Sequence, residues 1–349
     1  MSGKETYGKR GLSLLGRFGL DPFVLMLLVM IVLAKLFPQG GTGEGPWSLS
    51  SLAGYGVSLI FFFYGLKLNF AGLKAGLRNW KLHLVVHSST FLLFPLLVWA
   101  CKGLLPDAAY TLWLGTFFLA SLPSTVSSSV VMVSIAEGNI PAAIFNASIS
   151  SILGVFITPV WMGMVNTGAA GGADMSDIIT KLILQVLVPV ALGVLFNKKW
   201  GHWADRHKKQ LKYFDQSIIL TIVYTAFCHS FAERLFSNIG PADLVLLGVG
   251  MLALFFVAYF ITTMACKAFS FNRADTITAT FCGSKKSLIH GTVMSKVLFG
   301  QSTLTGILLL PLMVYHALQL IVVSMIAQKL AKDHHKAPAT GETGGKLKA

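Results

Sequence analysis

The sequence predicts an all-α polytopic membrane protein of ten transmembrane helices, on three observations. First, 54% of the 349 residues are hydrophobic and only 12% are charged, whereas soluble domains carry about a quarter charged residues. Second, the apolar residues gather into blocks of about 20, the length that a membrane helix needs. Third, Lys and Arg concentrate in tails and loops that would lie on one side of the membrane, and they are sparse in the loops of the other side. Such a chain has too few polar side chains to cover a surface that faces water.

Ten apolar segments are long enough to cross a membrane, although the fourth and the ninth are interrupted. In chain order they cover roughly 21–38, 49–66, 82–101, 108–136, 140–166, 176–196, 214–232, 241–268, 274–299 and 302–329. No small-residue cleavage site of the kind found in signal peptides follows the basic start of the chain, so we expect the first span to be retained.

The 28 Lys and Arg residues orient these spans. Basic residues collect in cytoplasmic loops, and here they cluster before span one, after spans two, six and eight, and after span ten. Both termini are therefore predicted to be cytoplasmic. The net charge of +14 follows from this topology, so we do not expect nucleic-acid binding. The loop after span six is the most basic, and we expect it to meet anionic lipid head groups.

Ten spans divide into two sets of five, and because five is odd the second set is inverted relative to the first. Inverted repeats are the usual architecture of secondary transporters. The predicted parts are a cytoplasmic N-terminal tail (1–20), a first repeat (21–166), a linker (167–175), a second repeat (176–329) and a disordered cytoplasmic tail (330–349).

The fourth span is interrupted near its middle by Pro123. Proline removes one backbone hydrogen bond and blocks another. The residues that follow it mostly carry hydroxyl groups: Ser124, Thr125, Ser127, Ser128 and Ser129. These hydroxyls can satisfy the freed backbone groups, and they can also offer oxygen atoms to a ligand. Taken alone, the pattern is also typical of a Pro-kinked helix with packing serines.

The ninth span has a counterpart, in which Gly283 and Ser284 are followed by Lys285, Lys286 and Ser287. Two adjacent lysines at membrane depth cost several kcal/mol, so such residues normally face a cavity or a partner. The alternative is that this segment is a cytoplasmic loop. The two interruptions fall in the fourth span of each half, and paired breaks of this kind predict a binding site at the membrane midplane.

Motifs around both breaks resemble a known family. They are Leu122 to Ser129 with 137–139 and 143–148 in the first half, and Phe281 to Leu288 with 310–316 and Gln319 in the second. They are similar to motifs of the bile acid:sodium symporter superfamily (solute carrier family 10), and most closely of its bacterial sodium–bile acid cotransporters in the member-seven-like branch. The resemblance covers essentially the whole membrane region.

The resemblance implies a panel domain of spans one, two, six and seven, and a core domain in which the broken spans cross. By motif position it implies a sodium site at Ser127, Ser128, Ser129 and Asn146. The further candidates for substrate or ion binding are Thr125, Ser150, Ser284, Lys285, Lys286, Ser287, His316 and Gln319.

The chain departs from the sodium-coupled pattern in the ninth span. Sodium-coupled members of the family carry a glutamate and a glutamine there, whereas this chain has Lys285 and Lys286 and no acid. The family's second sodium site is therefore expected to be lost, because an ammonium group repels Na⁺. In one hypothesis a lysine replaces the cation and couples transport to H⁺ through its protonation. In the other it attracts an organic anion, and a sodium site of serines and Asn146 can still survive. Proton coupling, or none, is favoured only slightly over sodium coupling.

Catalytic and metal motifs are absent from the sequence. His83 and His87 are one helical turn apart, but no third ligand has a suitable spacing, so we expect a hydrogen-bonded packing pair. No Ser-His-Asp set, phosphate loop or zinc motif is present, and neither enzymatic activity nor a cofactor is expected beyond Na⁺ or H⁺ as the coupling ion.

The predicted function is secondary active transport of a small organic anion, bile-acid-like or sterol-like, by a symporter-like alternating-access mechanism. The predicted location is a bacterial inner membrane. The competing hypothesis is a membrane regulatory or scaffold protein that keeps the fold but has lost transport. The loss of the midplane carboxylate favours it slightly, while the two retained helix breaks argue against it.

Overall fold

The computed structural model describes residues 22–68, 79–104, 109–165, 180, 183–237, 240–300 and 302–336, in which all regular secondary structure is helical. The predicted N-terminal tail at 1–20 and the linker at 167–175 lie outside these residues. Six described segments are long and apolar enough to cross a membrane: Leu49–Leu66, Trp80–Ala100, Ile140–Val165, Ile183–Arg206, Pro241–Ala268 and Thr305–His334. This agrees with a polytopic membrane protein, while the count of ten spans and the inverted repeat stay predictions.

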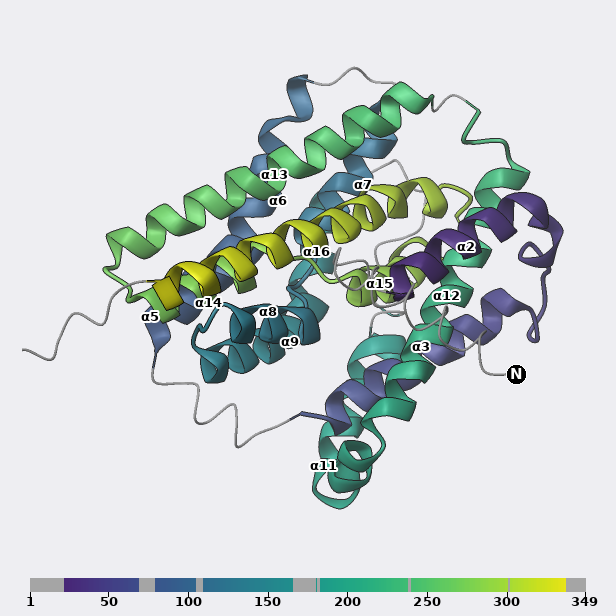
Figure 1. Cartoon of the computed structure of the whole chain (residues 1–349). Helices are drawn as coiled ribbons and strands as arrows, with labels where there is room; N and C mark the ends of the chain where they lie inside the picture. The colour runs from purple at the N-terminus through teal and green to yellow at the C-terminus, as the bar shows by residue number, and fades with distance from the viewer. Residues whose placement is uncertain are drawn as a thin grey trace, which may run out of the picture.

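The helices form two groups that lie side by side (Figure 1). The smaller group contains α2 (Pro22–Leu36), α3 (Leu49–Leu66), α11 (Val188–Arg206) and α12 (Lys208–Ala232). The larger group contains α5 (Trp80–Ser88), α6 (Phe94–Ala100), α7 (Tyr110–Ser121), α8 (Ser127–Ile135), α9 (Ile140–Val165), α13 (Pro241–Ala268), α14 (Arg273–Ser284), α15 (Leu288–Phe299) and α16 (Thr305–Lys336). The smaller group consists of the helices at the positions of predicted spans one, two, six and seven, while the panel and core domains stay a prediction.

Two short π-helical segments continue the helices next to them. Ser89–Leu93 joins α5 to α6 into one span, and Ile183–Leu187 leads into α11. Two 3₁₀ turns, Pro38–Gly40 and Lys102–Leu104, follow α2 and α6. The π-helical segment in the third span matters for the site, because it changes which backbone carbonyls have partners.

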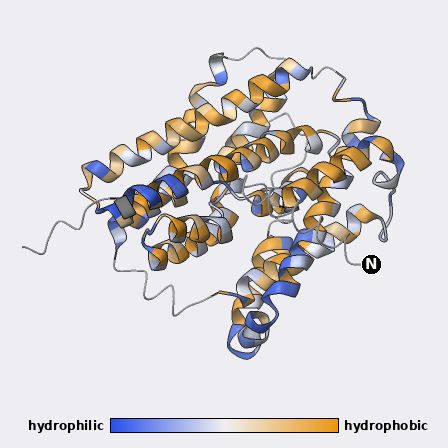
Figure 2. Ribbon diagram, viewed as in Figure 1, coloured by the Kyte–Doolittle hydropathy of each residue, from blue (hydrophilic) through white to orange (hydrophobic). Residues whose placement is uncertain are grey.

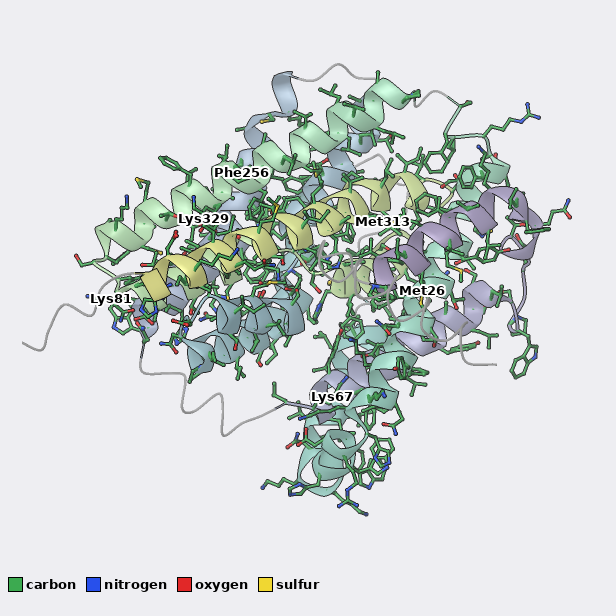
Figure 3. The ribbon with its side chains drawn as sticks, viewed as in Figure 1. Met26, Lys67, Lys81, Phe256, Met313 and Lys329 are labelled. Carbon is green, nitrogen blue, oxygen red and sulfur yellow. The ribbon has the colours of Figure 1, made fainter. Side chains whose placement is uncertain are left out.

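The outer surface of the larger group is apolar. On α13, Val245, Leu246 and Phe260 are each more than 60% exposed, and Figure 3 shows Phe256 on the same helix. Figure 2 shows hydrophobic residues along the middles of the helices and hydrophilic residues mainly at their ends. A continuous apolar surface of this kind is what lipid requires, because hydrocarbon offers no partner to a polar group.

The helices α3 and α11 approach at their backbones. A Cβ atom added to Gly65 would collide with the Val190 carbonyl oxygen, and one added to Gly193 would collide with the Phe62 carbonyl oxygen. Small residues allow such close approach between membrane helices. The absence of side chains at Gly65 and Gly193 therefore permits the tight packing of the smaller group.

The helix α11 is longer than the apolar pattern predicts, because it continues past 196 to Arg206, and α12 begins at Lys208 and not at 214. The extension packs Ala204 and Leu211 against Leu66. In the same region the Asn197 side chain donates hydrogen bonds of 2.7 and 3.0 Å to the Leu66 and Leu68 carbonyls at the end of α3. These tertiary contacts extend the helices beyond the apolar segment.

At the other end of the chain, α16 continues to Lys336, into the segment from 330 onward that the sequence assigned to a disordered tail. The rest of that segment, from 337, lies outside the described residues.

Candidate functional site

The two predicted interruptions are present, and they meet. The fourth span is divided between α7 and α8, and the ninth between α14 and α15. The backbone N–H of Ser287 donates a 2.9 Å hydrogen bond to the Pro123 carbonyl. Ser287 also caps α15, because its Oγ accepts from the His290 N–H at 3.3 Å. The break in one half of the chain is therefore joined directly to the break in the other.

Lys286 is fully buried, and its ammonium group has three backbone acceptors. Its Nζ lies 2.6 Å from the Thr90 carbonyl oxygen, 2.6 Å from that of Ala120 and 2.9 Å from that of Leu122. It also lies 4.3 Å from the centroid of the Phe94 ring, within the range of a cation–π interaction. An ammonium has three donors, so these carbonyls use all of them.

The backbone of Lys286 is held as firmly as its side chain. Its N–H donates to Gln319 Oε1 at 2.8 Å, and its carbonyl accepts from Gln319 Nε2 at 2.8 Å. The same Nε2 lies 2.8 Å from His316 Nδ1 on α16. His316 and Gln319 therefore position the ninth-span break through its backbone.

Lys285 has a different environment, although it is also fully buried. Its backbone is extended, with φ −98° and ψ 146°, and successive side chains of an extended chain point to opposite sides. Its Nζ donates a 2.8 Å hydrogen bond to Ser128 Oγ, the one partner that it has among the described side chains. Its other two donors have no acceptor among the described residues, which leaves them for a ligand.

Hydroxyl groups form a small cluster around Lys285. Thr125 Oγ1 lies 2.8 Å from Ser128 Oγ and 2.8 Å from Ser129 Oγ. The Ser127 side chain lies outside the described residues. The structure therefore brings together four of the predicted site residues, Thr125, Ser128, Ser129 and Lys285.

The Asn146 side chain makes its hydrogen bonds outside the hydroxyl cluster. Its Oδ1 lies 3.1 Å from His83 Nδ1, and its Nδ2 donates to the Ala142 carbonyl at 2.8 Å. It makes no hydrogen bond to the hydroxyl cluster in the described part of the chain. The expectation that His83 and His87 form a hydrogen-bonded pair is wrong, because neither ring nitrogen of His87 has a hydrogen-bond partner among the described residues.

Ser150 and Ser284 support the breaks. Ser150 Oγ accepts the Ser124 N–H at 2.9 Å, just after Pro123. Ser284 Oγ donates to the Thr280 carbonyl at 2.6 Å, within α14. Both side chains therefore form hydrogen bonds with backbone groups of the two interrupted helices in this structure.

Several residues of the site were not among the predicted site residues, although Tyr315 lies within the 310–316 motif. Tyr315 donates from its hydroxyl to the Ser284 carbonyl at 2.6 Å, and Ser89 Oγ donates to the Gly283 carbonyl at 3.1 Å. Thr90 contributes a carbonyl, which no side-chain pattern can show. One feature of the sequence could have pointed to a free carbonyl in this region. Pro95 lies inside the third span and has no N–H, so a carbonyl in the preceding turn loses its helical partner.

Two fully buried lysines, Lys285 and Lys286, dominate the electrostatics of the site. None of the ion pairs in the described residues includes Lys285 or Lys286. The buried carboxylate of Asp215 lies in the smaller group, where it is 3.4 Å from Lys67 Nζ; Figure 3 shows Lys67 at the end of α3. The described residues hold no cluster of His, Cys, Asp or Glu able to bind a metal ion.

The chain is similar in sequence to known membrane transporters over most of its length. The SBF-like CPA transporter family matches residues 21–332. The chain is 39% identical to protein PA2026 of Pseudomonas aeruginosa, over 93% of this chain and 96% of that protein. It is 31% identical to sodium/bile acid cotransporter 7-B of Xenopus laevis (90% and 93% covered), and 31% identical to sodium/bile acid cotransporter 7 of Rattus norvegicus (90% and 94% covered).

Proposed function

Because the chain belongs to the SBF-like CPA transporter family, we propose that it carries a small organic anion across a bacterial inner membrane by alternating access, with Lys285 as the group that binds the anion. Family membership makes the chain a multi-pass, symporter-like membrane transporter and not an enzyme. The observation that supports the substrate class is the Lys285 ammonium, buried where the two helix breaks meet and hydrogen-bonded to one neutral hydroxyl.

The helix ends around Lys285 favour an anion. The hydroxyl that it contacts belongs to Ser128, in the first turn of α8, and Ser287 on the other side of it caps the start of α15. Helix N-termini carry partial positive charge, and half-helix N-termini recognise anionic groups in other transporters. A buried ammonium at such an end is unfavourable unless an anion accompanies it. A carboxylate or sulfonate of the substrate would supply that partner.

The relatives' names support an anion of a particular kind. Two of them are sodium/bile acid cotransporters, and bile acids are sterol-derived anions. We infer that the substrate is an organic anion of bile-acid or sterol type. The two lysines occupy the break at which sodium-coupled members carry an acid, so we expect transport to proceed without Na⁺ and to be coupled to H⁺ or uncoupled.

The experiment is a thermal-unfolding titration of the purified protein with cholate or taurocholate, Na⁺ and protons, combined with uptake into proteoliposomes. A ligand that binds the native state raises Tm. Bile acid should raise the Tm of the wild type and of Lys35→Gln, a control at the end of α2, but should not raise that of Lys285→Gln. Uptake should continue when Na⁺ is replaced by choline.

Two results would overturn parts of this proposal. Na⁺-dependent uptake that persists in Lys285→Gln would overturn both the anion-binding role and sodium independence. No response of Tm or uptake to any organic anion, Na⁺ or pH would favour the alternative, a membrane regulatory or scaffold protein that retains the fold.

The smaller group also supports a proposal about membrane orientation. The end of the α11–α12 hairpin is hydrophilic (Figure 2), carries Lys198, Lys199, Lys208 and Lys209, and exposes Trp200, Trp203 and Tyr213. Basic and aromatic residues together are typical of the membrane interface. We propose that this end and both termini are cytoplasmic and that the hairpin contacts anionic lipid. Phosphatidylglycerol should therefore raise the Tm more than phosphatidylcholine.

A further inference from the structure

The three acceptors of Lys286 come from two places in the chain. Thr90 lies in the π-helical segment Ser89–Leu93, whereas Ala120 and Leu122 lie at the end of α7. Their carbonyl oxygens surround Nζ at 2.6, 2.6 and 2.9 Å, and the Phe94 ring lies on another side. We call this arrangement the carbonyl cage. It contains backbone oxygens and an aromatic ring, and these groups hold a cation through dipoles and not through a counter-charge.

The local backbone explains why these oxygens are free to bind a cation. Phe94 donates its N–H to the Ser89 carbonyl, five residues back, and Pro95, the next residue, has no N–H. In a helix the Thr90 carbonyl would accept a hydrogen bond from the N–H of residue 94 or 95, and here neither residue donates to it. The helix α7 ends at Ser121, and the Ser124 N–H that could have reached Ala120 donates to Ser150 Oγ. The cage is therefore a set of orphan carbonyls, with α7 contributing the negative end of its dipole.

We propose that the carbonyl cage of Thr90, Ala120 and Leu122 is a small-cation site that the chain fills permanently with the Lys286 ammonium, and that shortening this side chain opens the site to a free ammonium or methylammonium ion. Rings of backbone carbonyls replace the hydration shell of a monovalent cation in other membrane proteins. Here the N···O distances are those of charge-assisted hydrogen bonds, so the space matches an –NH₃⁺ group.

The tethered cation has a structural consequence. It joins the π-helical segment of the third span, the end of α7 and the break between α14 and α15, and Gln319 fixes the same residue to α16. Four spans of the larger group are thereby connected through one residue. Because the cation is covalently attached, this junction needs no ion from solution. The inference does not rest on the proposed substrate, since all three donors of Lys286 are used.

The test is a cation titration of Lys286→Ala, with thermal unfolding of the purified protein as the readout. Ionic strength is held constant with choline chloride, because choline is too large for the cage. We expect Lys286→Ala to unfold at a lower temperature than the wild type, and ammonium or methylammonium to raise its Tm in a saturable way. The wild type should not respond. Lys286→Met, which fills the space without a donor, should be destabilised and should not respond either.

Lys285→Ala is the matched control, because it removes the same atoms from the neighbouring lysine. It should show no ammonium-dependent rise in Tm. A Lys286→Ala variant as stable as the wild type, or one that responds to ammonium no more than to choline or Na⁺, would overturn the proposal.

A variant too unstable to titrate is tested by purification in ammonium and in choline. Monodisperse Lys286→Ala protein recovered only with ammonium supports the cage. Aggregation in both salts, while Lys285→Ala is recovered in both, contradicts it.

Discussion

Lys285 and Lys286 are neighbours in the sequence, yet their ammonium groups have different surroundings. Lys286 donates to three carbonyl oxygens, and Lys285 donates to one serine hydroxyl. The extended backbone between α14 and α15 directs consecutive side chains to opposite sides, so one lysine points toward the end of α7 and the other toward the start of α8. The helix end that each one meets accounts for the difference: a cation is favoured at a C-terminus and disfavoured at an N-terminus.

At this scale the Gln319 clamp makes a first prediction. Gln319→Leu removes both hydrogen bonds to the backbone of Lys286 and leaves a buried N–H and a buried carbonyl unpaired. Each unsatisfied group costs about 1–3 kcal/mol, so we expect a clear loss of stability in denaturant or thermal unfolding. Gln328→Leu is the control on the same helix, because Gln328 is exposed and its side chain bonds, among the described residues, to Ser324 within α16. It should change stability little. Equal stability of the two variants would contradict the clamp.

The broken helices show how an element can end inside a membrane without unsatisfied backbone. Ser150 and Ser287 satisfy N–H groups at the two breaks, and Tyr315 and Ser89 satisfy carbonyls at the end of α14. Irregular backbone at membrane depth is tolerated when protein groups surround it. Helix packing within the smaller group depends instead on two glycines, Gly65 and Gly193, where α3 meets α11.

A second prediction concerns that packing. Gly65→Ala places a methyl group against the Val190 carbonyl, and overpacking of this kind costs about 1–3 kcal/mol. Gly54→Ala is a matched control on the same helix, because a Cβ at Gly54 has no atom within 4 Å. It should be neutral or should stabilise α3 by up to about 1 kcal/mol. Thermal unfolding of the two variants checks the difference, and a stable Gly65→Ala protein would show that the helices can separate without cost.

On the scale of the whole molecule, the two groups of helices must move relative to each other if transport is by alternating access. They are joined at the start of α3, where Lys296 Nζ on α15 donates to Ser50 Oγ, and near the end of α12, where Ser230 Oγ donates to the Thr303 carbonyl just before α16. A small pocket lies at this junction, and its polar lining includes Ser50, Thr225, His229, Lys296, Ser302 and Thr305. Each of the two hydrogen bonds crosses between the groups, so a change in their relative position must break them.

A third prediction tests this junction. Lys296→Met removes the bond to Ser50 and should favour separation of the groups there, so deuterium exchange at the start of α3 and the end of α15 should become faster. Exchange around Gly65 and Gly193, which lie within the smaller group, should stay unchanged as an internal control. Ser50→Ala should have a similar effect, and the double variant should add little, because both substitutions remove the same bond. Fully additive effects would argue against a shared contact.

The sequence by itself determined where the chain is apolar and where its fourth and ninth spans are interrupted. These properties are local, because the length of an apolar block, the missing N–H of Pro123 and the positions of Lys285 and Lys286 within an apolar segment can all be read from neighbouring residues in the chain. The apolar pattern placed the end of the sixth span at 196, whereas α11 continues to Arg206. Contacts of Asn197, Ala204 and Leu211 with the end of α3 extend the helices there.

Only the tertiary structure decided what the two lysines contact. The acceptors of Lys286 lie 164 to 196 residues away, and Asn146, grouped with the serines by motif, is instead hydrogen-bonded to His83. Backbone carbonyls carry no signature in the sequence, because every residue has one, and whether a carbonyl is free depends on how its helix ends. The division between a tethered cation at Lys286 and an available one at Lys285 therefore arises from the way distant helix ends meet.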